Sequence, residues 1–254
     1  MEELKLTKCP KRYFIGTHRA LEPEETLRLI EPKTKIIGVT RISDITGLDR
    51  VGIPIYSCVR PRAAEGATSV YSGKGVTSIL AKVSVIMEAI ERYSAEVKPQ
   101  DEDKMIKGSY KELSVRYNVV DPSTLILPFS TPYTLSSTLR WIKGFDLMNE
   151  EEVLVPVSAV FHPYNPKDDL HLFRTNTNGL ASGNTMEEAI LHGLMEVIER
   201  DAWSLAELSK CGGKIIEVSE EHKLVRELLE KFERASIKVF LRDITSDLGI
   251  PVIA

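Results

Sequence analysis

The sequence predicts a mixed α/β fold, α+β in its element order, organised around a duplicated strand–turn–helix core. The main observation is a repeated hexad: MEAIER at 87–92 returns as MEVIER at 195–200, with five identical positions. A second observation is that short runs rich in Ile, Val and Thr alternate with patterns of helical period. A repeat of this kind indicates two copies of one unit that face each other across a single site. The same offset of 108 residues (196 − 88) pairs Gly75 with Gly183, Thr77 with Thr185 and Ala81 with Ala189.

The first part of the chain is expected to hold one short helix and several strands. Pro23 suits the first helical position and predicts a helix over 23–30. The runs 35–42 and 53–59 are rich in Ile, Val and Thr and predict strands. Residues 69–71 are expected to extend a strand into the first glycine turn.

Each hexad belongs to an amphipathic helix, because its apolar residues recur with the helical period of 3.6. The first helix is expected from about 78 to 97, and the second turn and helix from 177 to about 210. Trp203 continues the second helix and is expected in the core. The predicted apolar stripes consist of Ile79, Val83, Ile86, Ile90 and Tyr93 in the first helix, and of Ile190, Leu194, Val197, Ile198 and Leu205 in the second.

The remaining elements follow from local patterns. The segment 98–107 is polar and charged and predicts a loop, and the prolines within 117–132 predict a path over the surface. The runs 139–147 and 153–155 flank a polar turn and predict a hairpin. The elements expected after the second long helix are a strand at 214–218, a helix at 220–235 and strands at 237–241 and 250–253.

The glutamates of both helices lie opposite the apolar stripes. One interpretation is a solvated face, in which Arg92 and Arg200 pair with the glutamates four residues before them. Glu188 has an alternative role in a capping box with Thr185. The duplication favours a shared site, because stacked like charges need something positive between them. The residues of the two polar faces are Ser84, Glu88, Glu91 and Arg92, and Glu188, His192, Glu196, Glu199 and Arg200.

A divalent cation with a nucleotide would satisfy two facing carboxylate surfaces. Mg²⁺ takes carboxylate oxygens and is commonly shared with substrate phosphates, and Arg92 and Arg200 offer forked donors to phosphate. The glycine segments 72–75 and 182–185 precede the helices and suit an anion through their backbone amides, or they are simple turns. Neither has the Gly-Lys-Ser/Thr ending of a P-loop. The combination indicates a magnesium–nucleotide site of another kind.

These residues resemble the signatures of the YcaO family. The first signature, Ser-x3-Glu-x2-Glu-Arg, stands at 84–92. The second, Ser-x6-Glu-x3-Gln-x3-Glu-x2-Glu-Arg, stands at 181–200, with Ala181 in place of Ser and His192 in place of Gln. The family's asparagine before the second helix matches Asn184. The resemblance begins at 16–20 and extends to 251, so it covers nearly the whole chain.

The resemblance implies a YcaO-like fold that binds ATP and Mg²⁺ between the two copies and activates a peptide backbone amide. A nucleophile adds to the amide carbon, ATP phosphorylates the oxyanion, and loss of phosphate leaves a thioamide or an azoline. No side chain is identified as a covalent catalyst. The implied metal ligands are Glu88, Glu91, Glu188 and Glu199. The implied nucleotide contacts are Ser84, Arg92, Asn184, His192, Glu196, Arg200 and Arg19, the last of which has a surface cation as its alternative.

Within the family, the segment 18–26 resembles archaeal members that insert sulfur with a TfuA-like partner, so thioamidation of a peptide or protein substrate is favoured over azoline formation. A homodimer is expected. A different class of function is a non-catalytic peptide- or nucleotide-binding subunit. A metal-dependent phosphohydrolase is disfavoured, because the five histidines do not cluster with acidic residues. A single glutamine with abundant Lys and Glu is typical of a thermophile.

Composition excludes several other classes. The net charge is −4 and the pI about 5.8, so no general attraction to nucleic acid is expected. No apolar run reaches the ~18 residues of a membrane span. The three cysteines are far apart, which fits reduced thiols in a cytoplasmic protein. Residues 1–254 are expected to form one YcaO domain that lacks the C-terminal portion of the family.

Overall fold

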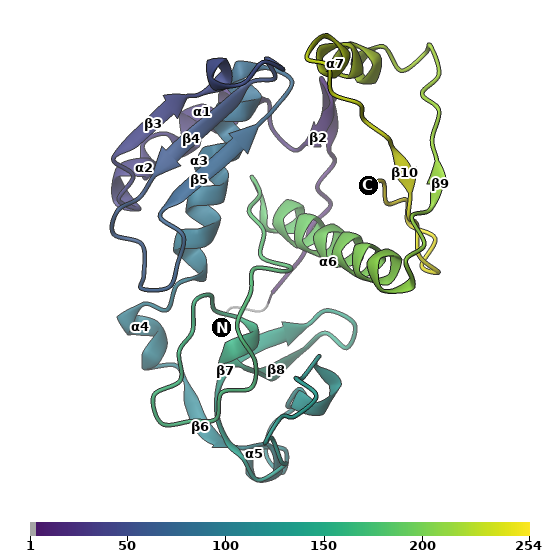
Figure 1. Ribbon diagram of the computed structural model, residues 1–254. Helices are drawn as coiled ribbons and strands as arrows, with labels where there is room; N and C mark the ends of the chain where they lie inside the picture. The colour runs from purple at the N-terminus through teal and green to yellow at the C-terminus, as the bar shows by residue number, and fades with distance from the viewer. Residues whose placement is uncertain (1–3) are drawn as a thin grey trace. The chain divides into compact units, whose positions relative to one another are not determined.

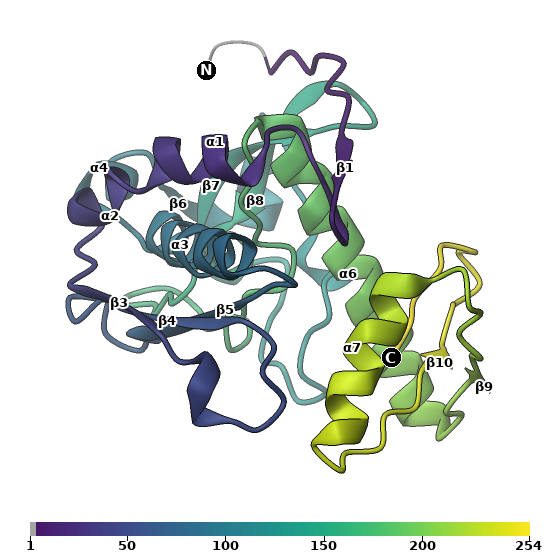
Figure 2. The same cartoon turned by 90° about the horizontal axis from the view of Figure 1, so that it is seen from above.

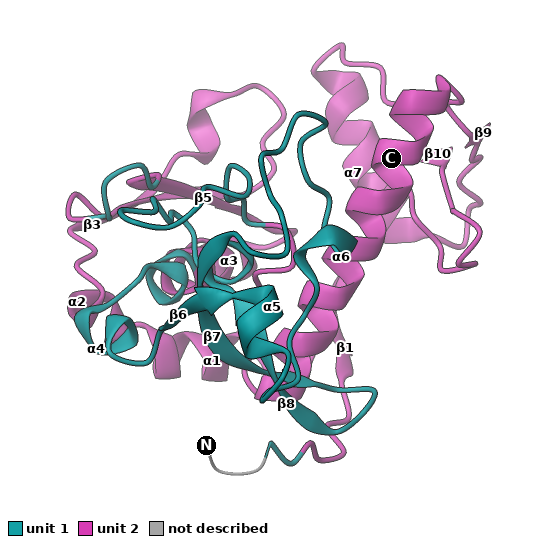
Figure 3. Cartoon of the chain, turned by 90° about the horizontal axis from the view of Figure 1, so that it is seen from below, with its two compact units in different colours: residues 1–5, 63–67, 92–177 teal, residues 6–62, 68–91, 178–254 magenta. Residues whose placement is uncertain are grey.

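The computed structural model describes residues 4–254, which fold into two compact units (Figure 3). Unit 1 comprises 63–67 and 92–177 with the first few residues of the chain, and unit 2 comprises 6–62, 68–91 and 178–254. Helices and sheets occur in both units, which confirms the predicted mixed class. None of the helices in the described residues is long and apolar enough to cross a bilayer.

Unit 2 contains one three-stranded antiparallel sheet, two short two-stranded antiparallel sheets and the two longest helices (Figure 1). The sheet has the order β3-β4-β5. The elements of this unit are β1 (Arg12–Phe14), β2 (Thr17–Arg19), α1 (Pro23–Ile30), α2 (Lys33–Ile36), β3 (Arg41–Asp44), η1 (Thr46–Leu48), β4 (Ile55–Val59), β5 (Val70–Lys74), α3 (Ser78–Ala95, shared with unit 1 from residue 92), α6 (Met186–Ser209), β9 (Lys214–Ile215), α7 (Lys223–Arg234) and β10 (Arg242–Asp243).

Helix α3 lies on one face of the β3-β4-β5 sheet (Figure 2). Gly73 of β5 makes this close approach possible, because a Cβ atom there would collide with the backbone of Val85 and with the carbonyl oxygen of Ala81. Beneath α3, the sheet contributes Tyr71 and Cys58, both almost fully buried. The absence of a side chain at Gly73 therefore sets how closely the helix approaches the sheet.

The turns before α3 and α6 repeat the same geometry. Thr77 Oγ1 accepts from the third residue on, Leu80 N, at 3.3 Å, and Thr185 Oγ1 accepts from Glu188 N at 3.2 Å. A Cβ at Gly75 would lie 2.7 Å from Ala81 N, and one at Gly183 would lie 2.5 Å from Ala189 N. The equivalent residues stand 108 positions apart in the sequence, so each copy has a threonine N-cap and a glycine at the same place in its turn.

The copies differ in what precedes the turn. The first has strand β5, whereas residues 178–185 form no strand. The glycine at the contact between segment and helix also lies on different sides. In the first copy it is Gly73 on the strand, which faces Val85 of the helix, and in the second copy it is Gly193 on the helix, which faces Ala181. In each copy one glycine allows the segment before the turn to approach the helix.

Unit 1 is a three-stranded antiparallel sheet of order β6-β7-β8 with short helices around it. Its core consists of Leu139, Trp141, Leu154 and Leu172. The Trp141 indole donates to the carbonyl oxygen of Gly108 at 2.9 Å, so the buried N–H is satisfied. The elements are α4 (Pro99–Glu102), β6 (Ile106–Ser109), α5 (Tyr110–Leu113), η2 (Pro122–Thr124), β7 (Thr138–Asp146), β8 (Glu151–Pro156) and η3 (Val157–Ala159).

The local expectations were right where the signal was strong. Helix α1 begins at Pro23 and ends at Ile30 as predicted, and β7 and β8 form the predicted hairpin. The loop predicted for 98–107 is wrong in part, because Pro99 and the Lys98 N–H, which donates to Asp101 at 3.0 Å, start helix α4, and strand β6 begins at Ile106.

Three predicted strands, at 35–42, 237–241 and 250–253, are also wrong wholly or in part. Residues 33–36 form helix α2, because Pro32 has helical backbone angles and lets the turn continue after α1. At the end of the chain, pairing begins later than predicted, at β10, and Ile253 forms only an isolated bridge to Asp243. Pro251 cannot donate to a ladder, which limits pairing there.

The predicted core face of α6 is wrong in part. Of its apolar stripe Ile198 is buried, whereas Leu194, Val197 and Leu205 are about half exposed, as is Trp203, which was expected in the core. The buried face is instead formed by small residues, Gly193 and Ala202, with Ile198. Ile198 and Ala202 pack against Val252 and its apolar neighbours, whereas Gly193 lies against Gly179 and Ala181 in the segment before the helix.

Candidate nucleotide site

Unit 2 holds a cavity of about 770 Å³ lined by α3 up to Glu91, the N-terminal half of α6, the turns before both helices, the β1–β2 hairpin and the start of α1. The two helices contribute equivalent faces to it. The lining residues that stand 108 apart are Lys74 and Ser182, Gly75 and Gly183, Val76 and Asn184, Leu80 and Glu188, Val83 and Leu191, Ser84 and His192, and Met87 and Met195. The repeated units therefore face one cavity, as the repeat predicted.

Seven of the residues predicted from the sequence line this cavity, and four do not. Those outside the lining lie toward the C-terminal ends of their helices, because the lining on α6 ends at Met195 and that on α3 ends at Glu91. The lining residues are Arg19, Ser84, Glu88, Glu91, Asn184, Glu188 and His192. The residues outside it are Arg92, Glu196, Glu199 and Arg200.

The structure supports an ion pair along the helix for Glu196, which was the alternative to a role in the site. Arg200 lies 3.5 Å from Glu196 along the same helix, and the other carboxylate oxygen of Glu196 accepts from Gly179 N at 3.0 Å. Glu196 thus forms the predicted i,i+4 pair and also fastens the segment before the second turn. Its neighbour Glu199 is exposed.

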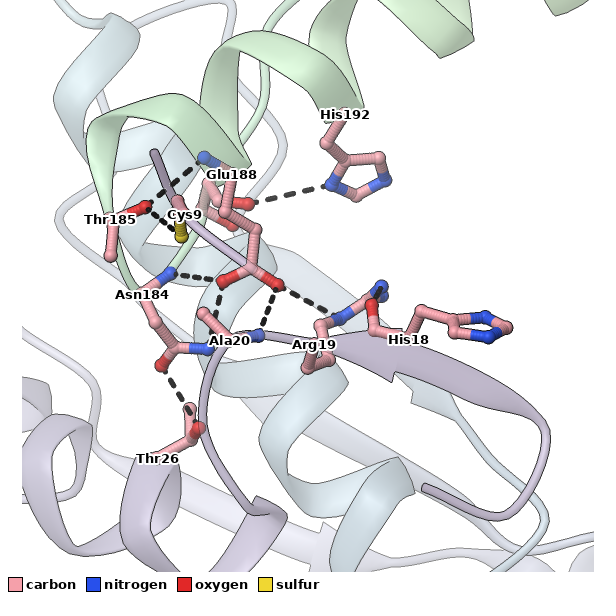
Figure 4. Close-up of polar contacts among 10 residues, drawn as sticks. Cys9, His18, Arg19, Ala20, Thr26, Asn184, Thr185, Glu188 and His192 are labelled. Carbon is pink, nitrogen blue, oxygen red and sulfur yellow. Dashed lines mark hydrogen bonds and ion pairs between the residues drawn. The ribbon is translucent and has the colours of Figure 1, made fainter. Parts of the chain in front are cut away.

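Glu188 lies at the centre of a buried polar network (Figure 4). The residue is only 3% exposed, and its Oε2 accepts from Asn184 N at 2.8 Å and from Asn184 Nδ2 at 3.0 Å. Its Oε1 accepts from Ala20 N at 3.3 Å and lies 3.9 Å from Arg19 Nε. The capping box is therefore incomplete: Thr185 caps the helix, but the Glu188 side chain turns to Asn184 instead of the Thr185 amide.

Sequence reasoning missed Thr26, whose hydroxyl donates to Asn184 Oδ1 at 2.9 Å. Thr26 is 3% exposed and lines the cavity from α1. A signal existed, because Thr26 stands one helical turn before the buried Ile30 and so occupies a polar position on the buried stripe of α1. The His192 ring also contacts the second turn, with Nδ1 3.4 Å from Ser182 O.

The donor set of the cavity suits an anion accompanied by a cation. Lys74, Arg19 and the amide ends of two helices supply positive potential. Glu88 and Glu91 supply carboxylates on α3. Within residues 4–254 no group of three His, Cys, Asp or Glu side chains could hold a metal ion alone. A cation here would need further oxygens from its ligand, which is how Mg²⁺ usually binds with phosphates.

The buried thiol near the site does not add to this donor set. Burial raises the pKa of Cys58 to about 11, the Arg60 guanidinium lowers the pKa, and the Glu88 carboxylate raises it further. The thiol is therefore protonated near neutral pH, whereas a cysteine that binds metal or attacks a substrate does so as the thiolate.

Comparison with known proteins gives the site a context. Residues 72–254 match the family described as YcaO cyclodehydratase, ATP- and Mg²⁺-binding. An uncharacterised protein of Methanothermobacter thermautotrophicus is 50% identical over 240 residues, covering 93% of this chain and 60% of the relative. A Rhizobium leguminosarum bv. trifolii protein described as lying in the tfuA 3′ region is 32% identical over 237 residues, covering 92% of this chain and 55% of the relative.

The structural comparison agrees with this match. The fold is similar to that of YcaO from Methanopyrus kandleri bound with AMPPCP and Mg²⁺, with a TM-score of 0.71 and 33% identity over 91% of this chain and 56% of the other. The predicted fold is thereby confirmed. The chain spans between 55% and 60% of the length of the two curated relatives described above.

Proposed function

The chain belongs to the YcaO family of ATP- and Mg²⁺-binding cyclodehydratases, and we propose that it activates a peptide backbone amide by ATP- and Mg²⁺-dependent phosphorylation. The observation that carries this proposal is the single cavity lined by equivalent faces of α3 and α6. ATP would supply the phosphoryl group that converts the amide oxygen into a leaving group. The protein then has to hold the phosphates and neutralise their charge, which is its usual part in phosphoryl transfer.

The lining suggests how these tasks are divided. We assign metal binding first to Glu88 and Glu91, because both face the cavity from α3. Arg19 and His192 are suited to contact phosphate oxygens, together with the backbone amides at the start of α6. Glu188 has most of its acceptor positions occupied by Asn184 and Ala20, which leaves Oε1 as the oxygen that can reach a cation. Ser84 lines the cavity between these groups.

The remaining signature residues keep their roles as predictions. Arg92, Glu196, Glu199 and Arg200 lie outside the lining. Glu199 is exposed, so a role as metal ligand requires a movement of α6 or of the nucleotide that brings the Glu199 carboxylate closer to the bound cation. The homodimer and the cytoplasmic location also stay predictions from the sequence.

Within this chemistry we favour thioamide formation on a peptide or protein, with sulfur delivered by a TfuA-like partner. The Rhizobium relative described as lying in the tfuA 3′ region supports this choice. No two cysteines form a Cys-x-x-Cys pair, and Cys58 is buried with a raised pKa, so we expect the sulfur to come from outside the chain. Azoline formation by cyclodehydration is the alternative product.

The experiment is mass spectrometry on a candidate peptide incubated with the protein, ATP, Mg²⁺ and sulfide, with and without a TfuA-like protein. Replacement of one oxygen by sulfur supports thioamidation. Loss of one water without any sulfur source identifies cyclodehydration instead. Nucleotide binding without any change in peptide mass would favour the non-catalytic binding subunit. A Glu91→Gln variant, which removes a carboxylate from the cavity, serves as the inactive control.

A further inference from the structure

Thr26 connects α1 to the turn before α6 through one hydrogen bond between two side chains. Its Oγ1 donates to Asn184 Oδ1 at 2.9 Å, across 158 residues of sequence. Thr26 is 3% exposed, and both residues line the cavity. A buried hydroxyl paired with a partly buried amide is a specific contact, because both partners give up water when the chain folds.

Asn184 has its other polar atoms engaged on the opposite side. Its backbone N and its Nδ2 both donate to Glu188 Oε2, at 2.8 and 3.0 Å. The amide must therefore turn its oxygen toward Thr26 and its nitrogen toward Glu188, since a carboxylate accepts and the hydroxyl here donates. Only this orientation of the amide satisfies both neighbours.

We propose that Thr26 is a positioning residue for the nucleotide site: its hydroxyl fixes the Asn184 amide, and through Asn184 it fixes the Glu188 carboxylate. The inference rests on the proposed function, because Asn184 and Glu188 line the cavity to which we assign the magnesium nucleotide. The Glu188 carboxylate also accepts a hydrogen bond from Ala20 N at 3.3 Å and lies 3.9 Å from Arg19 Nε (Figure 4). One hydroxyl on α1 thus sets the start of α6 and the end of β2 relative to each other.

Removal of the Thr26 hydroxyl should lower the affinity for nucleotide more than it lowers the stability of the fold. Thr26→Val keeps the shape of the side chain but leaves Asn184 Oδ1 without its donor. The amide is then free to rotate, and Glu188 loses a fixed partner. We expect affinity for magnesium nucleotide to fall about tenfold, the effect of one lost hydrogen bond to a buried group.

The test compares Thr26→Val with Thr26→Ser and with Thr34→Val. Serine keeps the hydroxyl and should restore most of the affinity. Thr34 is a matched control, because it is also buried, at 9% exposed, but its hydroxyl donates to the nearby Glu31 carbonyl oxygen at 2.7 Å. Calorimetry with Mg²⁺ and a non-hydrolysable ATP analogue gives the affinity of each variant, and thermal unfolding without ligand gives its stability.

The expected result is a loss of affinity for Thr26→Val alone, with a decrease in Tm similar to that of Thr34→Val. In an Asn184→Ala background, Thr26→Val should have no further effect on affinity, because the hydroxyl acts through the amide. Equal affinities of Thr26→Val and Thr34→Val would overturn the positioning role while leaving the proposed function intact. No binding of the analogue by the wild-type protein would refute the proposed function and this inference together.

Discussion

Glu188→Gln should destabilise the protein before any nucleotide is added, although the family signature presents this residue as a metal ligand. The carboxylate is 3% exposed and accepts three hydrogen bonds, two from Asn184 and one from Ala20 N. Glutamine keeps one acceptor oxygen and places an NH₂ group against N–H donors on the other side. The substitution therefore leaves at least one buried donor unsatisfied.

The size of the effect follows from these contacts. A hydrogen bond to a charged group contributes about 1.5–3 kcal/mol, so we expect a loss of about 2–3 kcal/mol. The Arg19 pair adds little, because Nε is 3.9 Å away and the arginine side chain is 44% exposed. For a chain of this size, about 2–4 °C of Tm is lost per kcal/mol, which gives a decrease of about 5–10 °C.

The assay is thermal unfolding of Glu188→Gln beside Glu196→Gln, without nucleotide or metal. Glu196 is a matched control on the same helix, since it also accepts a backbone N–H and pairs with an arginine, but its side chain is 23% exposed. We expect its substitution to cost under about 1 kcal/mol. Equal Tm values for the two variants would refute the reasoning that Glu188 is a structural acceptor in the folded state.

Three further predictions test other parts of the site. Glu91→Gln should weaken magnesium-nucleotide binding at least about tenfold in calorimetry with little change in Tm, because it removes a cavity carboxylate; unchanged affinity would exclude Glu91 as a metal ligand. Gly183→Ala should destabilise by about 1–3 kcal/mol in urea unfolding, because its Cβ would lie 2.5 Å from Ala189 N; a neutral result would mean that the second turn does not pack as described. Hydrogen bonds from the Thr7 backbone N–H and then from the Thr7 hydroxyl lower the pKa of Glu187 to about 2. The stability that the Glu187 carboxylate contributes should therefore be complete above pH 4.5, the ordinary pKa of a glutamate, and be lost as the pH falls from 4.5 toward 2. The Tm difference between wild type and Glu187→Gln should shrink over that pH range, and a constant difference would contradict this prediction.

The repeat was the most informative feature of the sequence. The offset of 108 predicted two copies facing one site, and the cavity is lined by residues at that offset from both helices. The N-caps at Thr77 and Thr185 and the glycines before them repeat as well, because their geometry depends on local sequence. Features set by a few neighbouring residues could thus be read directly from the chain.

Features that depend on tertiary packing could not be predicted from the sequence. The large apolar side chains of α6 suggested its core face, but the residues that the helix buries there are mainly small ones, Gly193 and Ala202, with Ile198. Glu188 looked like part of a solvated or metal-binding face, yet it is buried and contacts Arg19 at the end of β2 and Ala20 just after it, more than 150 positions away. Helical periodicity gives the direction of a side chain and says nothing about which distant segment meets it.

Calorimetric titration of the protein with ATP, first with Mg²⁺ and then with a chelator, tests the central claim most directly. The cavity contains three lining glutamates, Glu88, Glu91 and Glu188, which would repel a triphosphate unless a cation lies between them. We predict binding with Mg²⁺ and its loss when the cation is removed. Equal affinity under both conditions, or no binding under either, would contradict a magnesium–nucleotide site between α3 and α6.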